Sequence, residues 1–198
     1  MINQSQKAVV VLLLTLGGAA VASTDGWQRF SSSSHFSVLY PGAWVRNGVS
    51  TDRLQLRSSE GGAEGVGIKP GQAEITVMEA QESSKQTLAQ VIATYTQDTT
   101  VLSRKDVPGE ATSRGCSELK AVTSKEPAVP PGDSPISVPT IINTDFFCEI
   151  QGRKIVTLLR NWEGDKRQAE YQQVALRMAK GIRLTQPEDG GWPTSCHP

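Results

Sequence analysis

Apolar and polar residues alternate in three short stretches of the chain, which predicts three half-buried β-strands. These stretches run from Phe36 to Tyr40, from Arg53 to Arg57 and from Ala73 to Glu79. Successive side chains of a strand point to opposite faces, so this alternation buries one face and leaves the other polar. The first stretch ends at Pro41-Gly42, a dipeptide that favours a turn. Residues 24–34 lack the pattern, and we expect an irregular segment there.

Two later stretches have the periodicity of amphipathic helices. Apolar residues recur at i, i+3, i+4 and i+7 in both, as Leu88, Val91, Ile92 and Tyr95 and then as Tyr171, Val174, Ala175 and Met178. Ser83 or Ser84 can cap the first helix. The second runs from about Lys166 to Lys180, and Gly181 is a natural end point.

The segment between the helices predicts a hairpin and a central strand. Two strand-like stretches, GCSELKAVT and PTIINTDFFCEI, flank a Pro-rich and Gly-rich loop, EPAVPPGDSP at residues 126–135. A strongly apolar stretch follows, KIVTLLRNW, which predicts a strand covered on both faces. The order is therefore strands, helix, strands, helix. It predicts an α+β fold with a largely antiparallel sheet and helices packed on it.

The N-terminus has the three parts of a cleavable signal peptide. Lys7 precedes an apolar run, AVVVLLLTL, and small residues follow, ending in Ala20-Val21-Ala22. The apolar stretch is shorter than the ~20 residues that span a bilayer, so we expect cleavage and not a membrane anchor. We divide the chain into a signal peptide (1–22), a single domain (23–184) and a C-terminal tail (185–198). We expect the mature protein to be periplasmic or secreted, without stable membrane insertion.

Three cysteines, Cys116, Cys148 and Cys196, would meet an oxidising compartment, so one pair is expected. If the hairpin folds about Gly132, residues that face each other have numbers that sum to 264, which places Cys116 opposite Cys148. Facing Cβ atoms in an antiparallel pair lie about 4.5–5.5 Å apart, close to disulfide geometry. We therefore predict a Cys116–Cys148 disulfide, with pairing of Cys196 to either cysteine as the alternative.

Charge and motifs give little support for catalysis or nucleic-acid binding. Acidic and basic residues balance at 20 each, so no charge excess favours nucleic acid. Ser117 and Lys120 match the S-x-x-K motif of some hydrolases, but in a strand they point to opposite faces. Asp145 and Glu149 share one strand face, where we expect both to be solvated. We identify no catalytic residue, metal ligand or cofactor-binding residue.

The segment FSVLYPGAW, residues 36–44, resembles the opening strand of the PsbP/Mog1/DcrB superfamily. The later order of elements, with a helix after the third strand, a long hairpin and a C-terminal helix, is similar to that family as well. The resemblance covers roughly residues 36–183 and implies an α/β/α sandwich with a binding or assembly role. It implies no catalytic residues. Without it, Tyr40 and Trp44 would be interpreted as core anchors at a turn.

These features favour an exported, non-enzymatic module that binds another protein. Its most specific version is an inhibitor or immunity-type protein against a secreted effector, by analogy with exported proteins of this superfamily. We expect partner contacts on the Pro-rich loop, at Lys125, Glu126 and Asp133, because loops on a rigid sheet commonly carry recognition residues. The alternative is a small-ligand carrier or weak hydrolase. The sequence does not indicate the oligomeric state or the partner.

Overall fold

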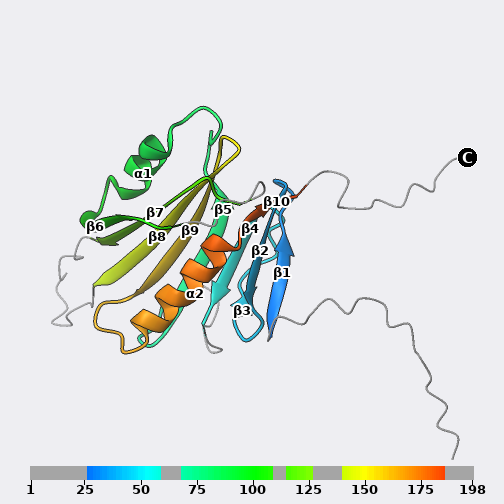
Figure 1. Cartoon of the computed structure of the whole chain (residues 1–198). Coiled ribbons are helices and arrows are strands. Elements are labelled where there is room, and N and C mark those ends of the chain that lie inside the picture. Colours follow the sequence, from blue (N-terminus) through cyan, green and yellow to red (C-terminus); the bar gives the residue numbers. More distant parts are fainter. Residues whose placement is uncertain (1–25, 59–67, 109–114, 127–139, 186–198) are drawn as a thin grey trace, which may run out of the picture.

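The computed structural model describes residues 26–58, 68–108, 115–126 and 140–185. Most of the strands form a seven-stranded sheet in the order β3-β4-β5-β9-β8-β7-β6, with every neighbouring pair antiparallel. Its strands are β3 (Val45–Arg46), β4 (Arg53–Arg57), β5 (Ala73–Glu79), β6 (Thr100–Asp106), β7 (Glu118–Lys125), β8 (Ile141–Ile150) and β9 (Arg153–Trp162). Figure 1 shows this sheet with one helix on each side.

The two helices pack on opposite faces of this sheet, as an α/β/α sandwich requires. Helix α1 (Leu88–Thr96) buries Leu88, Val91 and Ile92 against a small cluster that contains Phe147 of β8 and Val156 of β9. Helix α2 (Gln168–Lys180) buries its apolar stripe in the larger cluster on the other face: Tyr171, Ala175, Met178 and Ala179. The predicted α+β fold is therefore confirmed.

Strand β9 lies at the centre of the sheet, between β5 and β8. Ile155 and Leu159 belong to the cluster beneath α2, whereas Val156 faces the α1 cluster. Both faces of the strand are therefore covered, and its near-continuous apolar sequence follows from this position.

A smaller three-stranded sheet packs beside α2, in the order β1-β2-β10. Its strands are β1 (Trp27–Ser31), β2 (Phe36–Pro41) and β10 (Arg183–Leu184). The turn after β2 brings Trp44 onto Tyr171 of α2, with ring centroids 5.9 Å apart and the rings nearly perpendicular. Both rings are buried, so this turn anchors the small sheet to the core.

Some elements differ from the sequence-based expectation. Strands β1, β3, β6 and β10 were not predicted, and β1 occupies part of the segment expected to be irregular. The cap of α1 is Thr87, not Ser83 or Ser84: its hydroxyl accepts from Gln90 N–H while the Gln90 side chain accepts from Thr87 N–H. This reciprocal pair is a capping box, which satisfies two backbone donors at the helix start. Ser83 instead donates its hydroxyl hydrogen bond to Glu79.

The structure contains the predicted Cys116–Cys148 disulfide, but the predicted register is wrong. Cys148 faces Leu119, so the sum of paired numbers is 267 and the strands are shifted by three positions from the expected 264. A shift by an odd number exchanges the two faces of a strand. The observed register buries Leu119 in the cluster beneath α2, whereas the predicted one would have placed Lys120 there.

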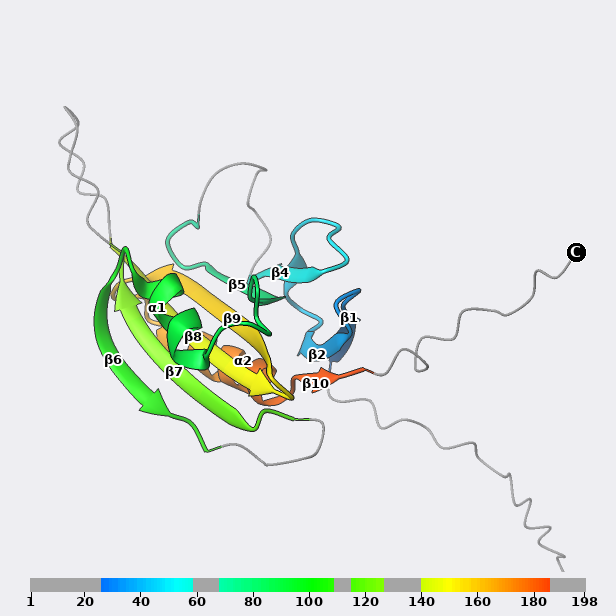
Figure 2. The ribbon, with the colours of Figure 1, turned by 90° about the horizontal axis from the view of Figure 1, so that it is seen from above.

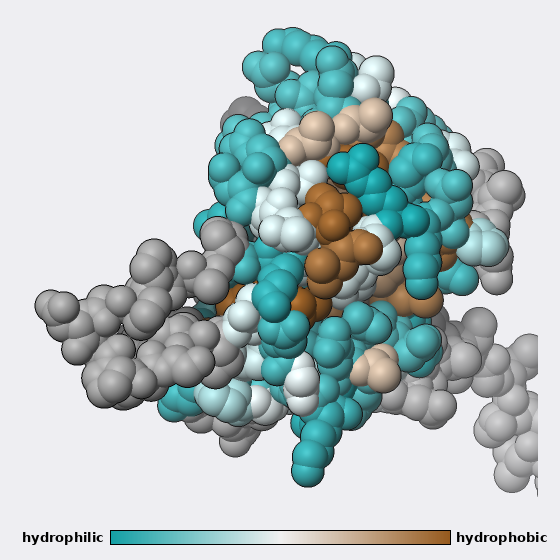
Figure 3. Space-filling model, turned by 90° about the vertical axis from the view of Figure 1, so that its left-hand side faces the viewer, coloured by the Kyte–Doolittle hydropathy of each residue, from teal (hydrophilic) through white to brown (hydrophobic). Residues whose placement is uncertain are grey.

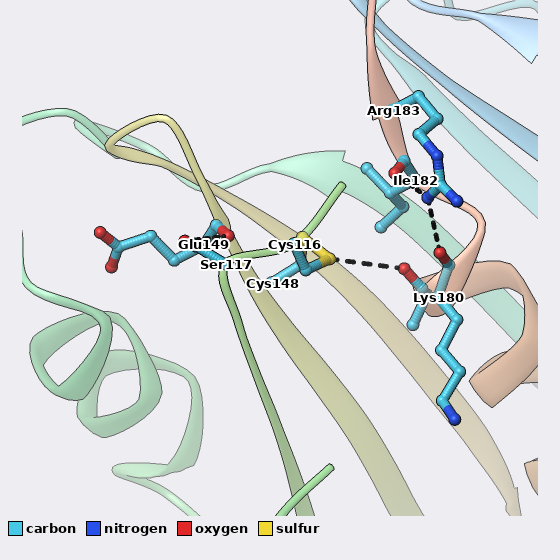
Figure 4. Close-up of a disulfide and its surroundings, with 8 residues drawn as sticks. Cys116, Ser117, Cys148, Glu149, Lys180, Ile182 and Arg183 are labelled. Atoms are coloured by element: carbon cyan, nitrogen blue, oxygen red, sulfur yellow. Dashed lines mark hydrogen bonds between the residues drawn. A yellow bond between two sulfur atoms is a disulfide. The ribbon is translucent and has the colours of Figure 1, made fainter. Parts of the chain in front are cut away.

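Cys116 lies before the first residue of β7, so it bonds to Cys148 without being part of the β7–β8 strand pairing. Ser117, the next residue, donates its backbone N–H to the Glu149 carbonyl at 2.7 Å. The disulfide lies beside the end of α2, and the Cys116 sulfur is 3.7 Å from the carbonyl oxygen of Ala179 (Figure 4). Cys196, the predicted signal peptide and residues 186–198 of the tail lie outside the described residues. Within the described ranges, no helix is long and apolar enough to cross a membrane.

Candidate protein-binding surface

The first residues of the predicted partner loop are tied to the sheet by ion pairs. Lys125 Nζ lies 2.9 Å from a carboxylate oxygen of Glu163, and Arg160 contacts Glu126 at 2.7 Å. Glu126 N–H also donates to the Ile141 carbonyl at 3.0 Å. Lys125 and Glu126 therefore have set positions at the end of β7. The third predicted residue, Asp133, lies outside the described residues, as does the rest of that loop.

A second candidate surface lies along β6, at the outer edge of the large sheet (Figure 2). Between β6, β7 and α1 there is a hollow of about 330 Å³, which we name the edge groove. Buried Ile92 and Val122 contribute apolar surface to it. Its lining residues are Ala89, Ile92, Arg104, Lys105, Asp106, Lys120 and Val122. Three of these residues are apolar and four are charged, so the groove combines apolar and charged surface.

Leu102 lies at a bulge in β6. Val101 pairs with Ser124 and Ser103 pairs with Thr123, so Leu102 is the extra residue of this strand. It is 55% exposed. Figure 3 views the molecule from the side on which β6 and α1 lie, and apolar residues gather near the centre of that face within a hydrophilic surround. The face therefore offers apolar contact area next to charge.

A bulge also explains why sequence periodicity missed this strand. An inserted residue breaks the alternation on which strand prediction depends. In the segment TVLSRKD, Val101 and Leu102 are adjacent and three charged residues follow. The bulge places Val101 opposite Ser124 and Ser103 opposite Thr123, so residues two apart in the sequence lie on opposite faces and show no alternation.

Another hollow lies near the start of α2, and we name it the Trp162 pocket. Its volume is about 510 Å³, and it is lined by Pro70, Gly71, Trp162, Glu163, Gly164, Asp165, Lys166 and Arg167. Two hydrogen bonds join its walls: Trp162 Nε1–H donates to the Ile68 carbonyl at 2.9 Å, and the Tyr171 hydroxyl donates to the Gly71 carbonyl at 2.8 Å. The volume and the Trp162 ring in its wall suit a small ligand.

Asp145 was expected to be solvated, and that expectation is wrong. It lies in β8 between Val122 of β7 and Leu158 of β9 and is 5% exposed. Burial raises its pKa to about 7, an effect that the Glu126 charge reinforces and that Arg160 and the Leu159 backbone oppose. Asp145 lines neither the edge groove nor the Trp162 pocket. A carboxyl so enclosed is a poor candidate for a residue that meets substrate.

Ser117 and Lys120, the two residues of the S-x-x-K motif, do not contact each other but bind other residues. The Ser117 hydroxyl donates to the Glu149 carbonyl at 2.9 Å. Lys120 Nζ lies 3.0 Å from Asp106 and 2.9 Å from Glu118. The lysine is thus held between two carboxylates, which raise its pKa, mainly through the Glu118 hydrogen bond. Neither side chain is arranged as a nucleophile with its base. The described residues contain no group of three or more His, Cys, Asp or Glu side chains that could hold a metal ion.

Comparisons with known proteins find similarity in structure but not in sequence. No protein-family model matches the chain, and no curated protein matches it. Among solved structures, the yeast Ran-binding protein Mog1p from Saccharomyces cerevisiae aligns with 82% of this chain and 97% of its own, at a TM-score of 0.49 and 11% identity. PsbP from the cyanobacterium Synechocystis aligns with 85% of this chain and 98% of its own, at 0.42 and 13%.

A third structure, from Bacteroides thetaiotaomicron, aligns with 82% of this chain at a TM-score of 0.47 and 10% identity. There the match spans 50% of the other chain, so this protein corresponds to half of that one. The predicted resemblance to Mog1 and PsbP is confirmed at the level of the fold. At these identities and TM-scores the likeness carries no argument about function.

Proposed function

We propose that this chain is an exported, non-enzymatic module that acts by stoichiometric binding to another protein. The observation that carries the proposal is the outer edge of the large sheet. Strand β6 is seven residues long, and among the described strands none pairs with its outer side. Proteins usually shorten, cover or charge such edges because an open edge is a template for another chain; β6 is charged, but it is long and no described strand covers it. Here the edge also borders the edge groove and exposed Leu102.

The opposite edge of the same sheet gives a useful comparison. Strand β3 has two residues, too few to support pairing with a partner strand. The long edge at β6 is therefore the side on which an added contact would gain most.

The loop that begins at Lys125 and Glu126 is a second proposed contact, with Asp133 as its third residue. Both ion pairs at its base support this proposal, because a fixed base lowers the entropy lost when a loop contacts a partner. The test replaces residues 127–135 by a short Gly-Ser linker. Loss of partner binding at an unchanged melting temperature supports the loop, whereas full binding removes it from the interface.

We further propose that the protein acts in the periplasm or outside the cell, as an inhibitor or immunity-type protein. The signal-peptide pattern of residues 1–22 and the Cys116–Cys148 disulfide support an oxidising compartment. A protein of this type binds over the active site or the functional surface of its target. One copy should therefore suppress the activity of one copy of a secreted effector. In this proposal, the mature chain consists of a single domain (23–184) followed by a C-terminal tail (185–198).

Site-specific photo-crosslinking in the exporting cell tests the binding function. A photoreactive amino acid replaces Leu102 or Lys125 in turn, and Val49 serves as the control because it is 95% exposed outside both surfaces. We expect one discrete crosslinked protein from Leu102, from Lys125 or from both, in a 1:1 complex. The Val49 position should give none. If all three positions give the same diffuse products, or none gives a discrete one, the chain is not a protein-binding module.

The alternative function, a small-ligand carrier, is favoured by one observation, the Trp162 pocket of about 510 Å³. Such a volume is in the range of drug-sized ligands. Native mass spectrometry of the purified protein would detect a bound molecule, and Trp162→Ala should release it. A carboxyl with a pKa near neutrality could serve as a general acid or base in hydrolysis. Burial raises the pKa of Asp145 to about 7, but this side chain is enclosed and cannot meet a substrate. We therefore propose no hydrolytic site.

A further inference from the structure

The hydrogen-bonding groups of β6 identify which part of its edge is open. Val107, which follows β6, donates its N–H to the Leu119 carbonyl at 2.8 Å. In an antiparallel ladder, residues that bond to the partner strand alternate with residues that do not. Val107, Lys105 and Ser103 therefore face β7. The backbone N–H and C=O groups of Arg104 and Asp106 point away from it, toward the outer edge.

The side chains along this half of β6 indicate the charge of what would bind there. Arg104 and Lys105 are exposed and form no ion pair with any residue that the structure describes. Lys120, in contrast, is already neutralised by Asp106 and Glu118. Two unmatched cations on one edge favour acidic side chains on a neighbouring strand, since opposite charges across a strand pair stabilise it.

The side chains of Arg104 and Lys105 lie on opposite faces of the sheet. Arg104 pairs with Val122, which belongs to the cluster beneath α1, whereas Lys105 pairs with Ala121, which packs with the cluster beneath α2. A strand added here would thus meet one cation on each face. On the α1 face it would also adjoin the apolar surface of Ile92 and Val122 in the edge groove.

The bulge at Leu102 limits how much of the edge can be used. A bulge disrupts the ladder and twists the strand, which discourages indiscriminate pairing. The regular pairing of β6 resumes at Ser103 and continues to Asp106. The usable part of the edge is therefore short, and binding there must depend on side-chain contacts as well as on backbone hydrogen bonds.

We propose that the Ser103–Asp106 half of β6 receives an extended, acidic segment of the partner protein, which adds to the sheet as a further strand. This proposal rests on the proposed protein-binding function and names its mode. The backbone groups of Arg104 and Asp106 form the new hydrogen bonds. Arg104 and Lys105 select acidic side chains, and the edge groove takes an apolar side chain of the segment. The charged edge then discriminates against neutral strands, including those of other copies of this chain.

Amide hydrogen exchange measured by NMR tests this mode on the mature protein. The probe is a short synthetic peptide of alternating Glu and Val, acetylated and amidated, at millimolar concentration. In the free protein, the Arg104 and Asp106 amides should exchange much faster than those of Ser103 and Lys105. With the peptide, exchange at Arg104 and Asp106 should slow by about tenfold when nine-tenths of the protein is bound.

Three controls accompany this experiment. A Lys-Val peptide of equal length should not bind, and a Glu-Val peptide with methylated backbone nitrogens should lose the protection. The Arg104→Glu/Lys105→Glu variant should lose at least tenfold in affinity for the acidic peptide. The matched variant Arg29→Glu, which removes an exposed cation from β1, should bind it as the unmodified protein does.

Failure of this mode is distinguishable from failure of the proposed function. If the acidic peptide leaves the Arg104 and Asp106 amides unprotected, or the lysine peptide binds equally well, strand addition is wrong. If a partner crosslinks from Lys125 but binds Arg104→Glu/Lys105→Glu with undiminished affinity, the protein-binding function stands and the edge is not its site. Concentration-dependent protection of Arg104 and Asp106 without peptide would assign the edge to a second copy of this chain and overturn the proposal.

Discussion

Trp44 links two parts of the molecule that are distant in sequence. Its ring is 9% exposed and packs edge-on against Tyr171, whose hydroxyl in turn donates to the Gly71 carbonyl. The turn after β2, helix α2 and the segment before β5 therefore meet at one point. Tyr40, the other aromatic residue of this turn, is only partly buried and donates a hydrogen bond to Gln28 at 2.8 Å. Trp44 is the anchor of the two.

Replacing Trp44 tests this structural role. Trp44→Ala should lower the free energy of unfolding by about 3–5 kcal/mol, because it leaves a cavity beside Tyr171. Urea denaturation followed by circular dichroism measures the change, and Trp44→Phe should lose less because it keeps a ring against Tyr171. A Trp44→Ala protein as stable as the unmodified chain but defective in binding a partner would instead place Trp44 in the interface.

Asp145 makes stability depend on pH. Its pKa is about 7 in the folded protein against 3.8 for an ordinary Asp, mainly because burial disfavours the charge. Three other titratable groups influence this region, and they are Tyr95 of α1, Arg160 of β9 and Glu126 after β7. The folded state holds a proton that the unfolded state has lost. Stability therefore falls as pH rises from about 4 to about 7 and is constant, as far as Asp145 is concerned, above that range.

Asp145→Asn should remove this dependence. Because the amide cannot ionise, the variant should lose less stability than the unmodified chain between pH 4.5 and pH 7.5, by urea denaturation at both values. Glu149→Gln, on the same strand, is the control and should keep the slope of the unmodified chain. An equal slope in Asp145→Asn would show that another group carries the dependence.

At the scale of elements, the disulfide joins β8 to the segment before β7, beside the end of α2. Cys148 lies in β8, Cys116 precedes β7, and both pack in the cluster that holds α2 (Figure 4). The bond closes a segment with a sequence separation of 32, which includes the hairpin loop. Such a bond stabilises the fold chiefly by restricting the unfolded chain, which lowers the conformational entropy that folding must overcome.

Removing the disulfide should have a large and specific effect. Cys116→Ala/Cys148→Ala should lower the free energy of unfolding by roughly 3–4 kcal/mol. Cys196→Ser is the matched control and should leave the free energy of unfolding unchanged, since we predict that Cys196 is free or intermolecular. Peptide mapping without reductant that finds Cys196 joined to Cys116 or Cys148 would contradict the pairing.

At the scale of the whole molecule, the proposed export and cleavage would determine which chain folds. We predict that the mature protein begins at Ser23, because Ala20 and Ala22 are the small residues that signal peptidase requires. Intact-mass measurement of protein released from the exporting cell gives the N-terminus directly. Ala22→Arg should block processing and retain the longer chain. A mass that includes Met1 for protein held in the membrane would contradict cleavage.

Much of the fold was predictable because several elements have a strong local pattern. Strands β4 and β5 have the bounds that their alternation predicts, and α2 begins within a few residues of the expected position. Strand β6 was missed because its bulge breaks the alternation, and β1 because TDGWQRFSSSS has too few apolar residues to form a pattern. Of the candidate contact residues, Lys125 and Glu126 were found from the loop they begin, but Arg104 and Lys105 could not be found before β6 was known to be an edge.

The sequence by itself determined which segments are amphipathic, how many faces of each are apolar and which cysteines lie on either side of a loop, since these properties depend on residues near one another in the chain. Tertiary structure decided the register of β7 against β8, the burial of Asp145 and the open side of β6. Each of these depends on which strands become neighbours. Register is set by the need to bury Leu119, and not Lys120, beneath α2, a helix some fifty residues farther along the chain.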